Sequence, residues 1–108
     1  MTAYLVADIK VTDDTWVSNY LTNVPELVHK HDGKYLFRGG NITTIEGEAL
    51  DTTAFSMLEF RSMAAAREFL NDPAYKEYAQ ARQAGSISKF LLIDGVDVIG
   101  AIPYLSKR

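Results

Sequence analysis

The chain of 108 residues contains no cysteine, which excludes disulfide bonds and thiolate chemistry. It also lacks an apolar run of the roughly 20 residues that a membrane-spanning helix needs. Its 11 Lys and Arg residues are scattered, and the net charge of −3 argues against a nucleic-acid-binding surface. The first ten residues include Asp8 and lack a basic segment, unlike a signal peptide. We therefore expect a cytoplasmic protein without nucleic-acid or membrane partners.

Several motifs of known chemistry are missing too. The segment Arg38-Gly39-Gly40-Asn41 lacks the P-loop lysine and the dinucleotide-binding spacing, and no Gly-x-Ser-x-Gly occurs. His29 and His31 stand two positions apart, which on a helix directs them to opposite sides. With no cysteine and no His-x₃-His pair, we expect no metal site and no cofactor. A histidine at a helix C-terminus is better explained as a favourable contact with the helix dipole.

The first third of the chain predicts a strand followed by a helix. Apolar and polar residues alternate from Ala3 to Val11, the period of a strand. Thr12-Asp13-Asp14 supplies helix-starting residues, and an amphipathic stripe then runs from Trp16 to His31. Pro25 interrupts this stripe, so we expect a kink or a restarted helix near Asn23-Val24.

The central stretch from Gly33 to Gly47 is the region where we expect a functional site. Gly33 should follow the helix as its C′ residue. The pattern then predicts a strand from Lys34 to Arg38 that continues from Ile42 to Glu46. Glycine tolerates bulges and positive φ, so Gly39-Gly40 should break or bulge this strand and re-aim Arg38 and Glu46.

The second half supplies the remaining elements. Ser62 is expected to cap a short helix, and Asp72-Pro73 to start another that ends at Gly85. The expected boundaries are a turn over 48–53, a strand over 54–61, helices over 63–70 and 74–84, a strand over 88–94 and a tail over 96–104. The order β-α-β-β-α-β predicts an α+β, ferredoxin-like fold with a four-stranded antiparallel sheet. We expect a single domain over 1–108, with its core at about 3–95 and a C-terminal extension over 96–108.

The third and fourth strands carry apolar side chains on both faces, whereas a sheet with one solvated face should alternate. Two helices can cover only one face. We therefore expect homodimerisation through the open sheet face, into a two-chain barrel. The alternative is that the tail folds over its own sheet. On the third strand, the apolar side chains are Phe55 and Met57 on one face and Leu58 and Phe60 on the other. On the fourth strand, they are Phe90 and Leu92 on one face and Leu91 and Ile93 on the other.

Three segments in this order, together with Arg82, resemble the small bacterial family catalogued as domain of unknown function thirteen-thirty. They are Gly33-Lys-Tyr-Leu-Phe-Arg-Gly-Gly, Ile45-Glu-Gly47 and Asn71-Asp-Pro-Ala-Tyr75. The resemblance covers about Tyr4 to Gly95, and its most specific part is Arg-Gly-Gly followed by Glu-Gly. That family belongs to the dimeric α/β-barrel superfamily, so the resemblance implies a ferredoxin-like homodimer but no established reaction. The family's recurring positions fall on Tyr20, Arg38, Gly39, Gly40, Glu46, Gly47 and Arg82.

The chain departs from the family pattern at two places. Asp32 stands where the family usually has a glycine or another small residue. The chain also continues past the fourth strand through Ile99, Ile102 and Tyr104. Such an extension can close access to a cleft.

Arg38 is the leading candidate for ligand binding, because a guanidinium on a bulged strand can bind a carboxylate or an enolate through two hydrogen bonds. The alternative is an internal ion pair with Glu46, Glu59 or Asp8. These three acids are also the candidate general bases, provided that burial raises their pKa. Otherwise they are rim residues or ion-pair partners of Arg38 and Arg82.

Tyr20 lies with Trp16 on the apolar face of the first helix. It either packs in the core with its phenol bonded at one edge or donates a hydrogen bond to a ligand. The residues thus predict a protein that binds a small anionic or aromatic molecule in a cleft between sheet and helices. The cleft residues are Arg38, Glu46 and Tyr20, with Arg82 as a further ligand-binding candidate.

The superfamily suggests, by analogy alone, a cofactor-free enzyme of the monooxygenase or isomerase type. Arginine would hold an anion, and a carboxylate would move a proton. The alternative function is a non-enzymatic structural or interaction homodimer whose charged residues make only internal pairs. The residues leave open whether the protein is an enzyme.

Overall fold

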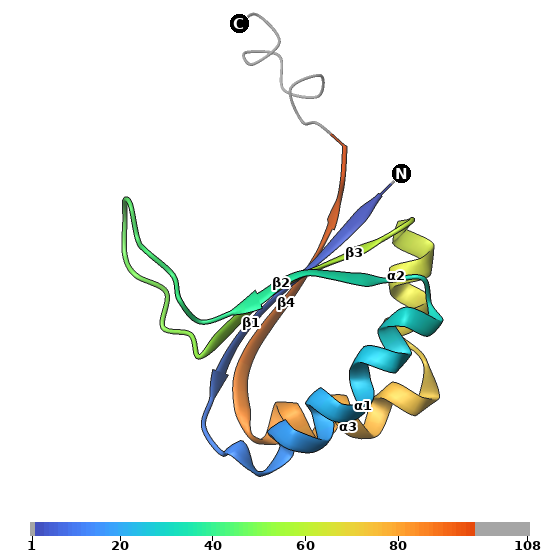
Figure 1. The fold of residues 1–108 in the computed structure, drawn as a ribbon, viewed down its shortest axis with the longest axis horizontal. Helices are drawn as coiled ribbons and strands as arrows, with labels where there is room; N and C mark the ends of the chain where they lie inside the picture. Colours follow the sequence, from blue (N-terminus) through green and yellow to red (C-terminus); the bar gives the residue numbers. More distant parts are fainter. Residues whose placement is uncertain (1, 97–108) are drawn as a thin grey trace, which may run out of the picture.

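The computed structural model describes residues 2–96, which form one antiparallel sheet covered by helices on one face (Figure 1). The strands lie in the order β2-β3-β1-β4. This is the ferredoxin-like α+β arrangement that the sequence predicts. The elements are β1 (Ala3–Val11), the 3-10 turn η1 (Asp14–Trp16), α1 (Val17–Lys30), β2 (Lys34–Gly39), β3 (Ala54–Phe60), α2 (Met63–Leu70), α3 (Pro73–Ala84) and β4 (Ser86–Asp94). No helix within residues 2–96 is both long and apolar enough to span a bilayer.

Helix α1 continues through Pro25 rather than restarting. Val24 and Val28 on either side of the proline are fully buried, and this packing favours one continuous helix over a break. The helix ends as predicted near His31, but the expectation for Gly33 was wrong. Asp32, not Gly33, takes the left-handed conformation, with φ 59°. Aspartate is one of the few non-glycine residues that tolerates this region.

Gly33 is required for a different reason, which is close packing. A Cβ atom on Gly33 would lie 2.5 Å from Cε1 of Phe60 and 2.9 Å from a methyl group of Val28. Both of those side chains are completely buried in the core. A side chain at Gly33 would therefore push the start of β2 away from β3 and α1.

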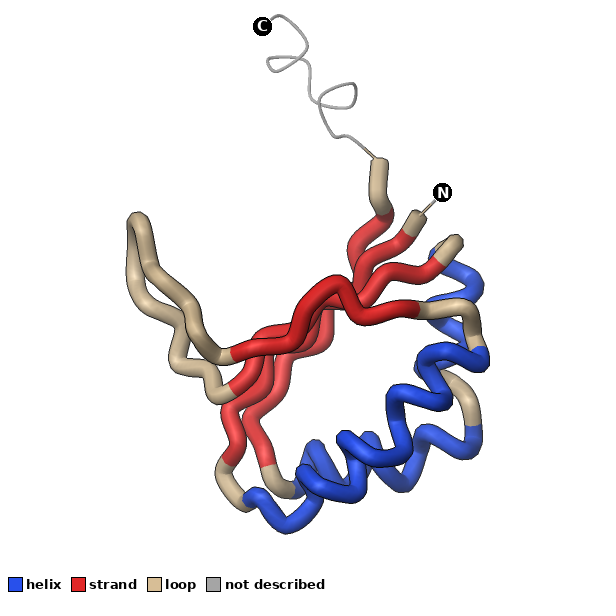
Figure 2. The backbone as a smooth tube through the Cα atoms, in the orientation of Figure 1, coloured by secondary structure: helices blue, strands red, loops and turns tan. Residues whose placement is uncertain are grey.

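The predicted continuation of the second strand from Ile42 to Glu46 was wrong. Residues 40–53 contain no strand and project from the sheet, away from the helical layer (Figure 2). Ile45 is 91% exposed, so within the described residues no neighbouring strand or core accepts it. The break does fall at the glycine pair, since β2 ends at Gly39. A Cβ atom on Gly40 would lie 2.5 Å from the carbonyl oxygen of Thr53, so Gly40 lets the two ends of the loop approach.

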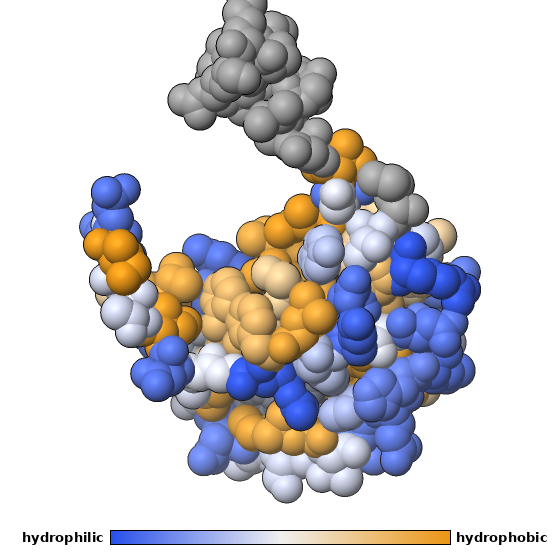
Figure 3. All heavy atoms as spheres, turned by 45° about the horizontal axis from the view of Figure 1, so that its top comes forward, coloured by the Kyte–Doolittle hydropathy of each residue, from blue (hydrophilic) through white to orange (hydrophobic). Residues whose placement is uncertain are grey.

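The inner face of the sheet and the three helices enclose the core. No helix of residues 2–96 covers the opposite face, which we call the outer face (Figure 1). Its exposed apolar side chains lie mainly on β2 and β4, and Figure 3 shows apolar residues gathered on this side. They are Leu36, Phe37, Ile87, Leu91 and Ile93, between 44% and 63% exposed. Of the predicted tail over 96–104, all but Val96 lies outside the described residues.

Asp72 joins the C-terminal end of α1 to the start of α3. One carboxylate oxygen accepts the backbone N–H of Ala74 at 2.9 Å, the N-cap contact expected from Asp72-Pro73. The other lies 2.8 Å from Nε2 of His31 and 2.9 Å from Nζ of Lys30. Hydrogen bonds from His31, Lys30 and the helix N-terminus hold the pKa of Asp72 well below its usual value. His31 thus contacts a carboxylate as well as a helix end.

Candidate functional site

A cavity of about 180 Å³ lies between the inner face of the sheet and helix α1. Its lining is almost entirely apolar, and the polar groups that reach it come mainly from Tyr20 on α1 and from Tyr35 and Arg38 on β2. The residues around it are Leu5, Ala7, Ile9, Val11, Trp16, Val17, Tyr20, Leu21, Val24, Tyr35, Arg38, Thr53, Ala54, Ser56, Leu58, Phe69 and Phe90. Few convergent polar groups in an apolar enclosure are typical of small-molecule sites.

Arg38 reaches the cavity because strand β2 is bulged. Tyr35 pairs with Leu58 and Arg38 pairs with Ser56, two residues that share the inner face of β3. The register shifts between Tyr35 and Phe37, not at the glycine pair where the sequence suggested a bulge. The Arg38 guanidinium carbon then lies 4.3 Å from the centre of the Tyr35 ring. The side chain is exposed, and within residues 2–96 it forms no ion pair.

Tyr20 links the cavity wall to a buried hydroxyl group on α3. Its hydroxyl lies 2.7 Å from the hydroxyl of Tyr75, which is 2% exposed. Burial, and then the neighbouring Tyr75 hydroxyl, raise the pKa of Tyr20 far above its usual value. Burial also raises the pKa of Tyr35, although the Arg38 cation opposes this effect. Both phenols are therefore neutral hydrogen-bonding groups at physiological pH, not bases.

The three predicted acids do not line the cavity. Asp8 lies on the outer face, paired in register with Lys89. Glu59 also lies on the outer face, where it forms an ion pair with Lys34 at 3.2 Å. Glu46 lies exposed in the projecting loop. The internal ion pair considered as an alternative for Arg38 is not formed among the described residues, and the role of these acids as general bases stays a prediction.

Arg82 is placed next to the cavity but does not line it. It is buried on α3, and its guanidinium carbon lies 3.9 Å from the centre of the Phe90 ring. Phe90 forms part of the cavity wall, so Arg82 lies behind that wall. The structure therefore brings together Tyr20 and Arg38 from the predicted set, leaves Glu46 apart, and puts Arg82 in an adjoining groove.

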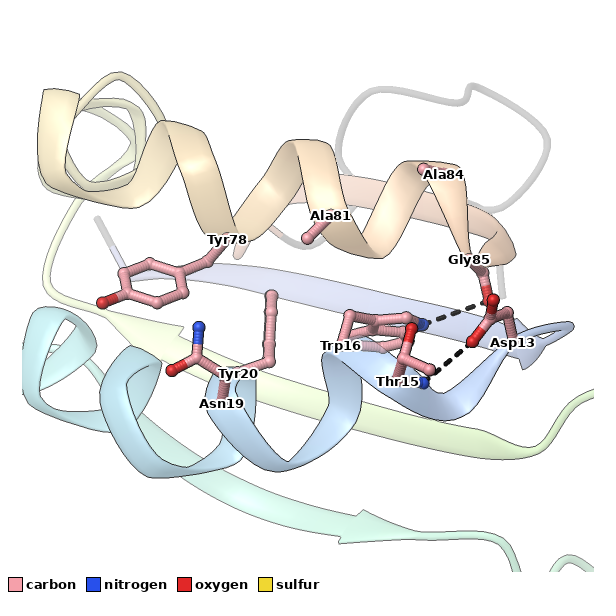
Figure 4. Close-up of a pocket in the computed structure, with 9 residues that line it drawn as sticks. All are labelled: Asp13, Thr15, Trp16, Asn19, Tyr20, Tyr78, Ala81, Ala84 and Gly85. Carbon is pink, nitrogen blue, oxygen red and sulfur yellow. Dashed lines mark hydrogen bonds between the residues drawn. The ribbon is translucent and has the colours of Figure 1, made fainter.

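Trp16 and Tyr20 form the wall between this cavity and a groove of about 430 Å³ between α1 and α3 (Figure 4). Their rings pack edge to face with centroids 5.3 Å apart. Trp16 donates a hydrogen bond from Nε1 to the carbonyl oxygen of Gly85 at 3.1 Å. Asn19 and Tyr78 also line this groove.

The sequence reasoning missed Tyr35 and Tyr75. Tyr35 stands three positions before Arg38, and in a regular strand that spacing puts two residues on opposite faces. Tyr75 belongs to α3, and no pattern in the sequence indicates that its hydroxyl meets that of Tyr20. As for metals, no group of three His, Cys, Asp or Glu side chains comes together within residues 2–96.

Comparison with known proteins identifies a family and a fold. Residues 2–96 match the family described as Domain of unknown function (DUF1330). No curated protein gives a significant match. Among solved structures, RPA0582, a protein of unknown function from Rhodopseudomonas palustris, is similar with a TM-score of 0.74 and 17% identity over 89% of this chain and 83% of that one.

Two further structures share the fold at lower similarity. SnoaB, a cofactor-independent oxygenase from Streptomyces nogalater, has a TM-score of 0.62 and 15% identity, and the match covers 89% of this chain and 94% of SnoaB. Rv0793 from Mycobacterium tuberculosis has a TM-score of 0.53 and 11% identity over 90% of this chain and 97% of its own. These likenesses confirm the ferredoxin-like α+β fold, and at such identities they establish the fold alone.

Proposed function

Because this chain belongs to the DUF1330 family, whose description names no activity, we propose a function from its cavity: it binds a small aromatic or enolic molecule that carries a negative oxygen. The observation that carries this proposal is Arg38 at the edge of an apolar cavity, with no acidic partner within residues 2–96. Among the described residues that line the cavity, the other titratable groups are the neutral phenols of Tyr20 and Tyr35. The cation of Arg38 can balance the charge of one negative oxygen, and the hydroxyl groups of Tyr20 and Tyr35 can donate hydrogen bonds to it.

The size of the cavity limits the ligand. Pockets for drug-sized ligands are typically about 300–1,000 Å³, and this cavity is smaller at about 180 Å³. The apolar side chains of β1 and α1 favour a flat hydrocarbon body, and Arg38 favours an oxygen that is already ionised at neutral pH. A phenolate or an enolate of one or two rings fits both requirements.

An enzyme built on this cavity would use the substrate's own acidity. The lining holds no carboxylate to act as a base, so the substrate would enter as its enolate, held by Arg38. With molecular oxygen as co-reactant, the enolate carbon would give an electron pair to O₂ and form a hydroperoxide. Loss of water from that carbon would leave a carbonyl group, so that CH₂ and O₂ become C=O and H₂O. The fold shared with SnoaB, a cofactor-independent oxygenase, supports this reaction class by analogy.

The outer face supports a homodimer as the working form. The exposed apolar side chains of β2 and β4 are unusual for a face in contact with water. The simplest way to bury them is to pack this face against the same face of a second copy of the chain. A purely structural dimer would also bury this face. It does not explain why Arg38, at an apolar cavity, has no ion-pair partner within residues 2–96, so we favour ligand binding.

The test compares the wild type with Arg38→Met and with Arg67→Met, which removes the same charge from an exposed site on α2. The probe is 2-hydroxy-1,4-naphthoquinone, an acidic enol, followed by thermal shift and by amide NMR. We expect a saturable response in the wild type and in Arg67→Met, and at least a tenfold weaker one in Arg38→Met. An equal response in all three proteins would rule out Arg38 as the anchor. Consumption of oxygen with the same probe would support the oxygenase reaction.

A further inference from the structure

A second groove, of about 400 Å³, lies between helix α3 and strand β4. Phe90 separates it from the cavity described above, because Phe90 lines both. The described residues that line it include one cationic side chain, Arg82, and no acidic one. Its lining residues are Leu70, Tyr75, Ala79, Arg82, Gln83, Ser86, Ser88 and Phe90.

Arg82 is the unusual member of this lining. Only 5% of the residue is exposed, and its Nε atom is buried without a hydrogen-bond partner among the described residues. No carboxylate within residues 2–96 forms an ion pair with it. The ring of Phe90, 3.9 Å from its guanidinium carbon, offsets part of the cost of burying this charge. A buried arginine is normally paired with an anion, but residues 2–96 supply no such partner for Arg82.

Two hydroxyl groups beside Arg82, those of Ser86 and Ser88, are linked by hydrogen bonds to its carbonyl oxygen. Ser86 donates its hydrogen to the carbonyl oxygen of Arg82 at 2.5 Å. Ser86 and Ser88 lie with their hydroxyl oxygens 2.5 Å apart, so Ser88 is the donor of that pair. Each hydroxyl group has one hydrogen and can rotate, so Ser88 can donate to a ligand in the groove when Ser86 turns its own hydrogen from the Arg82 carbonyl to Ser88.

We propose that this groove is a second binding site, in which Arg82 holds the carboxylate of a small organic acid and Ser88 donates to it. A carboxylate matches the single cation in charge and the guanidinium in shape. A phosphate dianion would need a second cation, which the lining lacks. Leu70, Tyr75 and Phe90 provide apolar walls, so the acid carries an apolar or aromatic body. The site stands apart from the Arg38 cavity and does not depend on the function proposed for it.

The experiment uses the full chain labelled with ¹⁵N and follows the Nε–H signal of Arg82 and the backbone amide of Ser88. Benzoate is the probe, and benzyl alcohol is the control without a carboxylate. Inorganic phosphate tests whether the groove binds a phosphate instead of a carboxylate. We expect benzoate to move both signals saturably, and the other two compounds to leave them in place. Signals that stay fixed up to high benzoate concentration, or that follow phosphate instead, would overturn the proposal.

Variants separate this site from a structural role of Arg82. Arg82→Met replaces a buried charge that has no ion-pair partner within residues 2–96 by an apolar chain of similar length. Its melting temperature should therefore not fall, while its benzoate response should be lost. Ser88→Ala, which leaves the guanidinium in place, should bind benzoate several-fold more weakly, and it keeps the test valid if Arg82→Met does not fold. Arg67→Met, which removes an exposed charge that lines neither site, should bind benzoate like the wild type. Unchanged binding in Arg82→Met or in Ser88→Ala would contradict the proposal.

Discussion

Arg38 lies over the ring of Tyr35 at 4.3 Å, although three positions separate the two residues in one strand. Regular alternation would put them on opposite faces of the sheet. The extra residue in the bulge between Tyr35 and Phe37 cancels this offset and brings both side chains to the inner face. The bulge thus brings to the cavity an arginine and one of the phenols, those of Tyr20 and Tyr35, that its described lining contains.

The hydrogen bond between Tyr20 and Tyr75 should be a measurable part of the core. Tyr20→Phe leaves the buried Tyr75 hydroxyl without its partner, which we expect to cost about 1–3 kcal/mol of unfolding free energy. The double variant Tyr20→Phe/Tyr75→Phe removes both hydroxyls and should cost less than the sum of the two single changes. Urea unfolding of all four proteins measures this, and strict additivity would show that the two hydroxyls do not interact.

Alkaline pH should weaken the fold through Tyr20. Burial raises the pKa of this phenol in the folded state, so folding favours its neutral form. The corresponding stability is fully present below the pKa of about 10 of an unfolded tyrosine and is lost as the pH rises above it. Melting temperatures between pH 8 and pH 11 should fall more steeply for the wild type than for the double variant Tyr20→Phe/Tyr75→Phe. Parallel curves would argue against a buried neutral phenol.

Acid should weaken the contact between α1 and α3 through Asp72. His31, Lys30 and the start of α3 hold the pKa of Asp72 below its unfolded value, so its contribution is present above about pH 4 and is lost as the pH falls below that. Asp72→Asn keeps an N-cap residue but loses the charge. We expect this variant to be less stable than the wild type at pH 7 and to lose less stability between pH 5 and pH 2. Equal acid sensitivity of the two proteins would contradict this role.

The outer face should control the oligomeric state. Leu91 on β4 is 55% exposed, and Leu91→Glu puts a charge on the proposed interface. Leu21→Glu is the matched control, because Leu21 is 54% exposed but belongs to α1 on the helical side. Light scattering after size exclusion should give a dimer for the wild type and Leu21→Glu, and a monomer for Leu91→Glu. A dimeric Leu91→Glu, or a monomeric wild type, would exclude this interface.

Two glycines at the ends of β2 should differ sharply in their tolerance of a methyl group. Gly33→Ala places a Cβ atom 2.5 Å from the buried ring of Phe60, and such overpacking typically costs about 1–3 kcal/mol. Gly39→Ala meets nothing within 4 Å and should change the unfolding free energy by less than about 0.5 kcal/mol. Thermal or urea unfolding of both variants tests the difference. A Gly33→Ala variant as stable as Gly39→Ala would mean that the neighbouring core side chains can move to accommodate the methyl group.

Local sequence patterns were enough for most of the fold. Asp72-Pro73 caps and starts α3 because proline suits the first turn and aspartate accepts its free N–H groups, and both effects act within three residues. The same patterns overestimated β2, because Ile42 and Ile45 look like strand residues. A strand also needs a neighbour to pair with, and within the described residues the projecting loop has none.

The sequence by itself determined the order of the elements, their caps and the apolar character of both sheet faces, since each follows from spacing along a single segment. Only the tertiary structure decided which polar groups meet. The bulge in β2 directs Arg38 inward, the packing of α1 against α3 brings Tyr20 to Tyr75, and the sheet keeps Asp8 and Glu59 on the far side from Arg38. These relationships join residues from separate elements and depend on strand register and helix packing, which no local pattern records.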